Sequence, residues 1–487
     1  MAGCIVRCYG ALKEKASSYF CFSKAALLMQ GLFFSHGFVQ LAFLSVMISL
    51  IEEISGKKIL WYNAVVSTLV EGTSSILVSL MSYDKYGRMF PKTSILITQG
   101  IFLTGLLILW LTPSSNIRAI YLVLSLVTVG KAGVRYITFF LERQIMLEHD
   151  IDDKKILEDR TKFWKVIGLI SGVGTAIGIS RRPWKLKFMF SAIAMGIGYL
   201  SFCFGLIYYK SERKITNIMP VVSEDNQSRK SSQSWRHLKL LPLWIPFLAY
   251  YVVQTAGTTF FLKQIDVVQV DILVKNIKFL DPETCMILVR SFPGVLLRPI
   301  LKRFSDKKYK LRAALTLGMV FNFCSCIASW HVEARRLHMF KKSGSNMNLF
   351  WLVPQFFLLG CAIELVGEGL EDFFSDLVPE SKQELGFAFN RLVEGMGKFI
   401  SVGFVLAFRN YWIGDTINKS RLDNYYRALA FLALGALFLF TYLSNTDGCT
   451  WEIDLEKSEE GDAAFPTDVE MDVLSTGNDG NLVSVRV

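Results

Sequence analysis

Long apolar runs recur along this chain from about residue 20 to about residue 445, and short charged stretches separate them. A segment that crosses the hydrocarbon core of a bilayer needs about 20 apolar residues, and it must be a helix so that its backbone hydrogen bonds are satisfied internally. Only 20% of the 487 residues are charged, which is less than a soluble protein of this size carries. The pattern therefore predicts an all-α polytopic membrane protein surrounded by a lipid bilayer.

The apolar runs predict about twelve transmembrane helices. The span at 284–301 is the weakest of them, because it contains Arg290 and Arg298 as well as two prolines. The predicted spans cover residues 22–51, 59–83, 93–112, 118–141, 163–181, 186–209, 242–262, 284–301, 313–332, 349–371, 386–408 and 426–444.

A polar segment rich in Ser, Lys and Arg divides these spans into six and six, and Lys and Arg concentrate in the connections after the even-numbered spans. By the positive-inside rule, both termini then lie in the cytosol. The acidic C-terminal segment cannot bury a core and is expected to be disordered. The predicted parts are a cytosolic N-terminus (1–21), an N-terminal six-helix bundle (22–210), a cytosolic linker (211–240), a C-terminal six-helix bundle (241–445) and an acidic cytosolic tail (446–487).

The formal net charge of +11 is a topology signal and does not indicate nucleic acid, because the basic residues follow the connections between spans. The nine cysteines form no C-x-x-C pair, and the five histidines are scattered. No catalytic arrangement, metal site or cofactor is predicted, so the chain is not expected to be an enzyme. Gly172, Gly174 and Gly178 lie within a span and indicate close helix packing.

The connection after the second span reads Asp84-Lys-Tyr-Gly-Arg88. It resembles the D-[RK]-x-G-R loop of the major facilitator superfamily, in which glycine permits a tight turn and the charges latch neighbouring helices. The resemblance implies a major facilitator fold of two six-helix bundles, and a gating role for Asp84 and Arg88.

Four further stretches resemble one family within this superfamily, the plant nitrate/peptide transporters of the proton-coupled oligopeptide transporter type. They occur in the family's order and in the matching spans. They are Gln254-Thr-Ala-Gly-Thr-Thr-Phe-Phe-Leu-Lys-Gln264, Val332-Glu-Ala-Arg-Arg-Leu337, Pro354-Gln355 with Gly369-Leu-Glu-Asp-Phe-Phe374, and Arg421-Leu-Asp-Asn-Tyr-Tyr426.

By this resemblance, Gln254, Thr258 and Lys263 contact the substrate. Arg135 occupies the place in the fourth span where the family has a basic residue facing the central cavity. An arginine cannot deprotonate there, so it would be a fixed positive charge for the negative end of a substrate. The alternative is a structural ion pair within the N-terminal half.

Charged residues also gather in the tenth and eleventh predicted spans. Glu364 and Glu368 are four residues apart and share a helix face, with Glu364 one position beyond the family's functional carboxylate. By the resemblance, Glu364 is expected to bind substrate and Glu368 to couple or gate transport. Arg391, Glu394 and Lys398 follow at i, i+3 and i+7 on one face. They can pair with the glutamates across a cavity and couple or gate transport, or they can form a structural network of their own.

The first span departs from the family. Members carry E-x-x-E-R there, and these carboxylates exchange the driving proton, whereas this chain reads Phe33-Phe-Ser-His36-Gly37. His36 can titrate near neutral pH, although a lone histidine in a span is more often a hydrogen-bonded structural residue. Protons are thus implied as partners by the resemblance alone, and the span-1 residues do not support proton coupling.

The predicted function is transport of a small nitrogenous or anionic solute, such as nitrate, a di- or tripeptide or a related metabolite, by alternating access. The family occupies the plasma membrane and the vacuolar membrane. The alternative prediction is a non-transporting member that acts as a sensor or scaffold, because the span-1 motif is missing and the tail is acidic.

Overall fold

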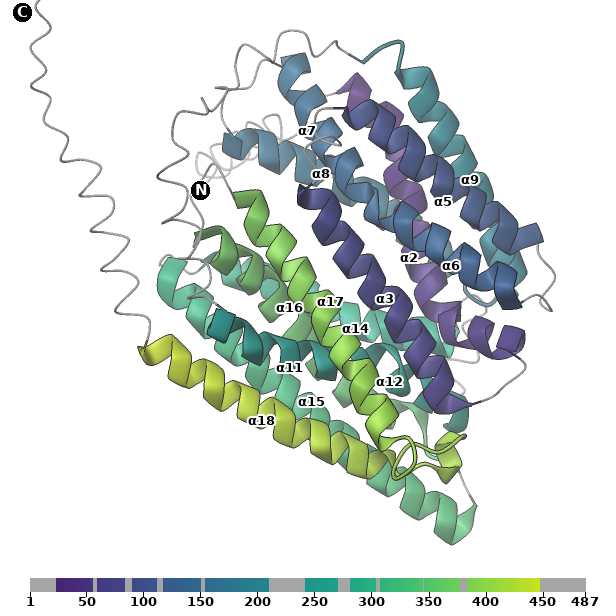
Figure 1. The fold of residues 1–487 in the computed structure, drawn as a ribbon, viewed down its shortest axis with the longest axis vertical. Coiled ribbons are helices and arrows are strands. Elements are labelled where there is room, and N and C mark those ends of the chain that lie inside the picture. Colours follow the sequence, from purple (N-terminus) through teal and green to yellow (C-terminus); the bar gives the residue numbers. More distant parts are fainter. Residues whose placement is uncertain are drawn as a thin grey trace, which may run out of the picture. The chain divides into compact units, whose positions relative to one another are not determined.

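A computed structural model of the chain describes residues 23–55, 59–83, 90–111, 117–149, 154–209, 241–269, 281–303, 307–344, 346–376 and 383–446. Within these ranges every regular element is a helix (Figure 1). Each of the twelve predicted spans coincides with one long helix or with two consecutive helices. The prediction of an all-α polytopic fold is confirmed.

The N-terminal half contains α2 (Lys24–Ser55), α3 (Leu60–Tyr83), α5 (Pro91–Leu111), α6 (Ile117–Ala132), α7 (Val134–His149), α8 (Lys154–Gly178) and α9 (Trp184–Gly205). The C-terminal half contains α11 (Leu241–Thr258), α12 (Phe260–Gln264), η4 (Ile265–Val267), α14 (Pro282–Arg303), α15 (Lys307–Ser343), η5 (Leu349–Leu352), α16 (Val353–Asp376), α17 (Gln383–Phe408), η7 (Ile417–Lys419) and α18 (Leu422–Thr446).

Two predicted spans are interrupted, which the apolar pattern did not indicate. The fourth breaks at Gly133, between α6 and α7, where the side chain of Thr98 fills the space that a Cβ would occupy. The seventh breaks at Thr259, whose backbone φ and ψ are −117° and −83°. There the hydroxyls of Thr258 and Thr259 both donate to the carbonyl oxygen of Thr255, at 3.1 and 2.9 Å. Such side-chain bonds compete with the helical ladder and bend it.

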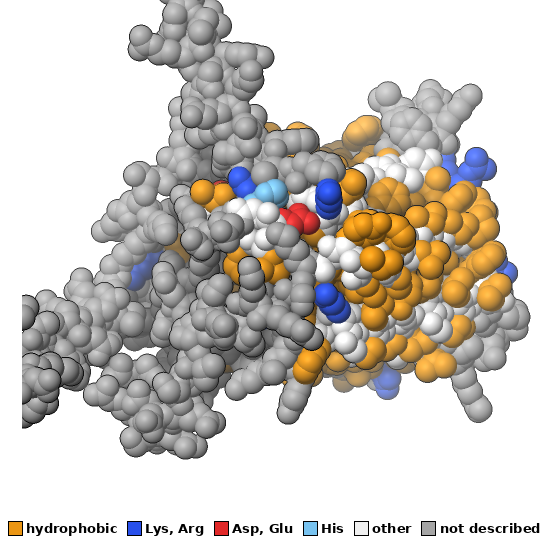
Figure 2. Space-filling view, turned by 90° about the horizontal axis from the view of Figure 1, so that it is seen from above, with side chains coloured by type: hydrophobic (Ala, Val, Ile, Leu, Met, Phe, Trp, Pro, Cys, Tyr) orange, Lys and Arg blue, Asp and Glu red, His pale blue; other side chains and the backbone are white. Residues whose placement is uncertain are grey.

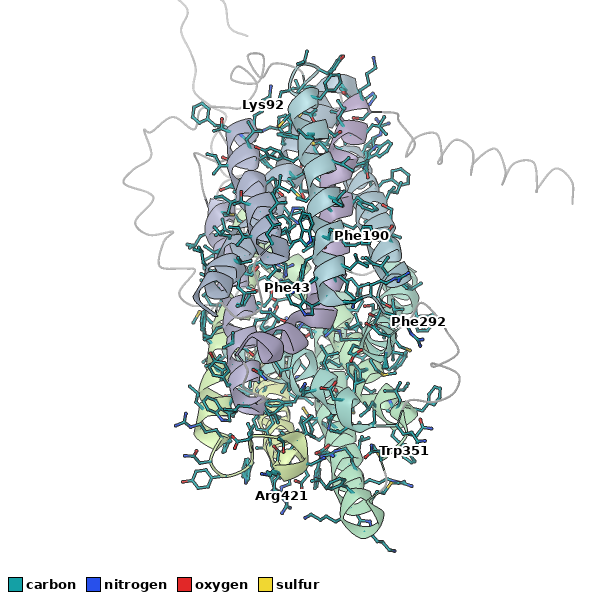
Figure 3. All side chains as sticks on the ribbon, turned by 90° about the vertical axis from the view of Figure 1, so that its right-hand side faces the viewer. Phe43, Lys92, Phe190, Phe292, Trp351 and Arg421 are labelled. Atoms are coloured by element: carbon teal, nitrogen blue, oxygen red, sulfur yellow. The ribbon has the colours of Figure 1, made fainter. Side chains whose placement is uncertain are left out.

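By length and composition, nine helical segments of the described chain are apolar enough to cross a membrane. The long helices α8, α14 and α17 carry more charge and fall outside that set. Figure 2 shows hydrophobic side chains spread over much of one side of the molecule, as expected for a surface that faces lipid. Lys92 follows the second predicted span and Arg421 follows the eleventh, so the two are predicted on opposite sides of the membrane. They lie near opposite ends of the helices (Figure 3).

Two groups of buried hydrophobic residues form the interior. The first extends from Ala25 to Tyr209 and lies wholly within the N-terminal half. The second is centred on α11–α18, and it also includes six residues of the N-terminal half, which are Phe38, Leu41, Ala42, Leu60, Ala64 and Ala176. The predicted boundaries of the two bundles stay predictions. The linker at 211–240 and the tail from residue 447 onward lie outside the described residues.

Helices α3 and α17 make the most extensive helix–helix contact between the two halves, and they lie side by side in Figure 1. They cross at Gly72 and Gly395, where an added Cβ at Gly395 would lie 3.0 Å from the carbonyl oxygen of Gly72. Near one end of this contact, the hydroxyl of Ser79 donates to the carbonyl oxygen of Ala388 at 2.7 Å. Close packing of glycine faces thus brings the charged residues of α17 against α3.

Helices α2 and α8 also approach closely, at one of the three glycines that the sequence indicated. A Cβ at Gly172 would collide with the carbonyl oxygen of Phe34 and lie 2.7 Å from the amide nitrogen of Phe38, whereas nothing lies within 4 Å of such an atom at Gly174 or Gly178. Of the three glycines, Gly172 is therefore the one at which the backbones of α2 and α8 are in close contact.

We expect Gly172→Ala to destabilise the protein and Gly174→Ala to leave it unchanged or slightly more stable. The first substitution forces two backbones apart, at a cost of about 1–3 kcal/mol or more. The second adds only the better helix propensity of alanine, up to about 1 kcal/mol. Melting temperatures of both variants in the same detergent provide the measurement, and equal temperatures would contradict the crossing.

Candidate functional site

A cavity of about 400 Å³ opens between α11, α14 and α16. Its wall combines polar side chains with glycines, so backbone and charged groups are both accessible within it. It is lined by Gln254, Thr258, Arg290, Ser291, Gly294, Val295, Gly360, Ile363 and Glu364.

Three residues predicted to bind substrate, Gln254, Thr258 and Glu364, line this cavity. They come from two helices that are about a hundred residues apart in the sequence, and the structure brings them together. Ile363, which aligns with the family's functional carboxylate, lines the same cavity beside Glu364. The one-residue shift therefore leaves the carboxylate at the cavity wall.

Arg290 lines the cavity, although no motif of the sequence includes it. In the sequence it is a charged residue that weakens the eighth predicted span. A charged residue within a span usually faces a cavity or a partner because exposure to lipid is costly. That rule would have identified Arg290, since it stands between apolar residues near the middle of α14.

Two glycines shape the wall on which Arg290 and Glu364 stand. A Cβ at Gly360 would collide with the backbone carbonyl of Arg290, so this glycine lets α16 approach α14. A Cβ at Gly294 would lie 2.7 Å from the Oε2 atom of Glu364. The Glu364 carboxylate therefore lies beside Gly294, one helical turn along α14 from Arg290.

Two buried polar atoms of the cavity residues have no hydrogen-bond partner within the described part of the chain. They are the Nη1 atom of Arg290 and the Oε1 atom of Gln254. Buried polar groups are nearly always hydrogen-bonded, and an unsatisfied one costs free energy. The residues of the cavity wall thus hold a donor and an acceptor whose hydrogen-bonding capacity is unsatisfied.

A chain of charged residues lies next to the cavity, at the contact of α3 with α17. The Nζ atom of Lys398 lies 2.8 Å from Glu394 Oε1 and 3.5 Å from Glu71 Oε2. Arg391 Nη1 donates to Glu394 Oε2 at 2.7 Å. The three α17 charges predicted to share a face therefore pair with one another, and the glutamate of α3 joins them.

Thr258 connects this network with the cavity. Its side chain lines the cavity, and its hydroxyl, which donates to the carbonyl oxygen of Thr255 at 3.1 Å, lies 3.5 Å from Glu71 Oε2. A solute that contacts Thr258 is therefore one residue away from the charge network that joins the two halves.

The other predicted substrate residues, Arg135 and Lys263, lie away from the cavity wall. The guanidinium of Arg135 stacks on the ring of Phe387, 4.4 Å from its centroid, and that of Arg391 lies 5.2 Å from the same ring. Lys263 forms an ion pair with Asp266 beyond the break in the seventh span.

His36 is buried in α2, where its Nε2 atom lies 2.8 Å from Gln99 Oε1 and its ring stacks on Phe102. Lys131 reaches the same region and lies 5.0 Å from the ring centroid of Phe43. This is the environment of a hydrogen-bonded structural histidine. Among the predicted gating residues, Asp84, Arg88 and the side chain of Glu368 lie outside the described residues.

Several motif residues meet in a second buried network, away from the cavity. Both carboxylate oxygens of Glu333 accept from Arg336, at 2.7 and 2.8 Å, and Oε2 also accepts from Gln264 at 2.7 Å. Gln355 donates to Gln264 at 2.8 Å, and Arg336 donates to Asn418 at 2.8 Å. These motifs hold the C-terminal half together.

Among the described residues, no group of three or more His, Cys, Asp or Glu side chains is placed to hold a metal ion.

Comparison with known proteins agrees with these motifs. Residues 221–412 match the PTR2 profile, which describes the POT family. Protein NRT1/ PTR FAMILY 5.7 of Arabidopsis thaliana is 28% identical over 229 residues. This part of the chain is similar to the POT family. That alignment covers 42% of this chain and 38% of the relative, so the chain spans less than half of that relative's length.

The likeness extends beyond the region that matches the profile. Protein NRT1/ PTR FAMILY 5.13 of Arabidopsis thaliana is 22% identical over 478 residues, with 77% of this chain and 84% of the relative covered. A crystal structure of peptide transporter POT in complex with sulfate superposes with a TM-score of 0.65 at 14% identity, covering 87% of this chain and 94% of that one. This likeness shows the major facilitator fold.

Proposed function

We propose that this chain transports a small nitrogenous or anionic solute across a membrane by alternating access. The observation that carries the proposal is the cavity between α11, α14 and α16, which is lined by Gln254, Thr258 and Glu364. The solved structural relative is a peptide transporter with sulfate bound, and the curated relatives carry the name NRT1/PTR. Both names are compatible with a small polar solute in such a cavity.

Alternating access requires two arrangements of the helices around one site. The charge network at α3 and α17 is suited to this, because the ion pair between Lys398 of α17 and Glu71 of α3 joins the two halves. Glu394 of α17 shares the same lysine. Solute bound at Thr258 contacts a hydroxyl that lies 3.5 Å from Glu71 Oε2. Binding in the cavity thereby acts on the contact that must rearrange.

Proton coupling is weak or absent in this proposal. The first span holds no carboxylate between Phe33 and Gly37, and His36 is engaged by Gln99 and Phe102. We expect saturable uptake of nitrate or of a dipeptide into proteoliposomes that contain the full chain, with little change when an inward proton gradient is applied. A strongly gradient-dependent flux would contradict weak coupling and leave transport intact.

A second candidate function is that of a non-transporting sensor or scaffold. The packed first span favours it, since the residues that replace the family's proton-exchanging motif are buried or partly buried between helices. The same uptake experiment separates the two functions. Binding of a solute without any saturable flux would favour the sensor.

A further inference from the structure

We propose that Arg290 of α14 is the residue that recognises the anionic group of the solute. This inference rests on the proposed function and names the residue and the chemistry of that same site. The ligand group is an oxyanion, either a carboxylate or a nitrate-type inorganic anion. Neither the motifs nor the comparisons assign a role to this position.

The first argument is the cost of placing this arginine where it lies. Arg290 lies in α14, which packs against α16 and α2. Its Nη1 atom is buried without a hydrogen-bond partner among the described residues. Arginine stays charged in proteins, so it cannot lower this cost by losing its proton. Among the described residues Glu71 interacts favourably with this charge, but no hydrogen bond satisfies the Nη1 donor. An unsatisfied donor on a charged group destabilises the fold, so a ligand that supplies an acceptor there removes a penalty.

The second argument is the state of the other cations near the cavity. Lys398 already lies between Glu394 and Glu71, and Lys263 pairs with Asp266. The guanidinium of Arg135 stacks on Phe387 and does not line the cavity. Arg290 both lines the cavity and has a donor atom that is unsatisfied within the described chain. Of these four cations, it is therefore the one suited to receive an anion.

The third argument is the shape and chemistry around the guanidinium. Its planar fork of N–H groups matches the two oxygens of a carboxylate or nitrate. The amide oxygen of Gln254, an acceptor that is unsatisfied within the described chain, belongs to the same cavity and suits a donor group of the solute, not its oxyanion. A small planar oxyanion can then approach the fork, while the rest of the solute reaches Gln254 and Thr258.

The test uses the purified full chain in lipid nanodiscs and three probes, which are sodium nitrate, alanyl-alanine and alanyl-alanine amide. We expect nitrate or the free-acid dipeptide to raise the melting temperature in a saturable way. The amide, which has lost the anionic group, should bind more weakly than the acid. In Arg290→Gln, the affinity for the oxyanion should fall at least about tenfold, because a charge-assisted hydrogen bond is lost. Arg290→Lys should retain part of it.

Arg335→Gln is the matched control, since it removes one positive charge from an exposed arginine that stacks on Trp351 outside the cavity. It should bind the probes as the unchanged protein does. If both oxyanions bind Arg290→Gln with unchanged affinity, or if neither stabilises the unchanged protein, the inference is overturned. The comparison of acid with amide needs no variant, so it decides the question even if Arg290→Gln fails to fold, and equal binding of both would overturn a carboxylate site.

The results that would overturn this inference differ from those that would overturn the proposed function. Uptake that persists in Arg290→Gln with unchanged affinity overturns the inference and leaves transport standing. Oxyanion binding that depends on Arg290, without any flux through the unchanged protein, overturns transport and supports the inference. Stabilisation by nitrate alone identifies an inorganic anion, and stabilisation by the dipeptide alone identifies a carboxylate.

Discussion

Replacing Glu333 by alanine is expected to destabilise the protein by about 3–5 kcal/mol, the cost of breaking a buried ion pair by removing one partner. Glu333 is 0% exposed and Arg336 is 2% exposed. In the variant, Arg336 would lose its carboxylate, and the Gln264 amide would lose the acceptor that lies 2.7 Å away. A large fall in melting temperature, or loss of folded protein in detergent, is the expected result.

Two controls separate charge burial from a general effect of mutation. Arg421→Gln breaks an ion pair with Asp423, but the Arg421 side chain is 52% exposed, so we expect a cost below about 1 kcal/mol. The double variant Glu333→Leu, Arg336→Leu removes both charges and should cost less than Glu333→Ala alone. A double variant that is less stable than the single one would show that the charges themselves are not the cause.

This network also explains what the motifs do. Gln264, Glu333, Arg336 and Gln355 belong to three of the stretches that indicated the family, and they meet in one buried cluster. Gln264 is 69 residues from Glu333 and 91 residues from Gln355 in the sequence. Their contact could not be predicted from the sequence, because it depends on how three helices pack. The motifs therefore predicted the family correctly, whereas three of their most distinctive residues, Glu333, Arg336 and Gln355, serve the fold and do not line the cavity.

The spans themselves could be predicted, because the need to satisfy backbone hydrogen bonds in lipid leaves long apolar helices as the solution. The breaks at Gly133 and Thr259 could not. They arise where a neighbouring helix approaches a glycine, or where two threonine hydroxyls share one carbonyl. Such local competition for hydrogen bonds does not alter the average hydropathy of the segment.

The candidate site was predictable in part. Helical spacing placed Arg391, Glu394 and Lys398 on one face, and the structure pairs them as a structural network would. Their fourth member, Glu71, depends on the crossing of α3 and α17 at Gly72 and Gly395, which no local pattern reveals. Arg290 was visible in the sequence as a charge in an apolar span, and only the cavity shows why it is there.

The second large effect is expected at Lys398. Substituting glutamine removes the cation that lies between Glu394, at 2.8 Å, and Glu71, at 3.5 Å. Glu394 keeps Arg391 as a partner at 2.7 Å, whereas Glu71 loses its ion pair with α17. Loss of this ion pair at a partly buried helix contact should lower solute uptake at least about tenfold, which corresponds to about 1.4 kcal/mol.

A double-mutant cycle tests whether the pair itself is responsible. Glu71→Gln alone should have a smaller effect, since Lys398 keeps Glu394, and Lys398→Gln with Glu71→Gln should transport better than Lys398→Gln alone. The readout is initial uptake rate per folded protein, with the melting temperature measured in parallel to exclude unfolding. If the double variant is no better than Lys398→Gln, the Glu71–Lys398 contact is not what limits transport. Recovery in the double variant would show that the contact between Glu71 and Lys398, at the junction of the two halves, limits the rate of transport. The cavity residue Thr258 lies 3.5 Å from the Glu71 carboxylate, so the cavity borders this contact.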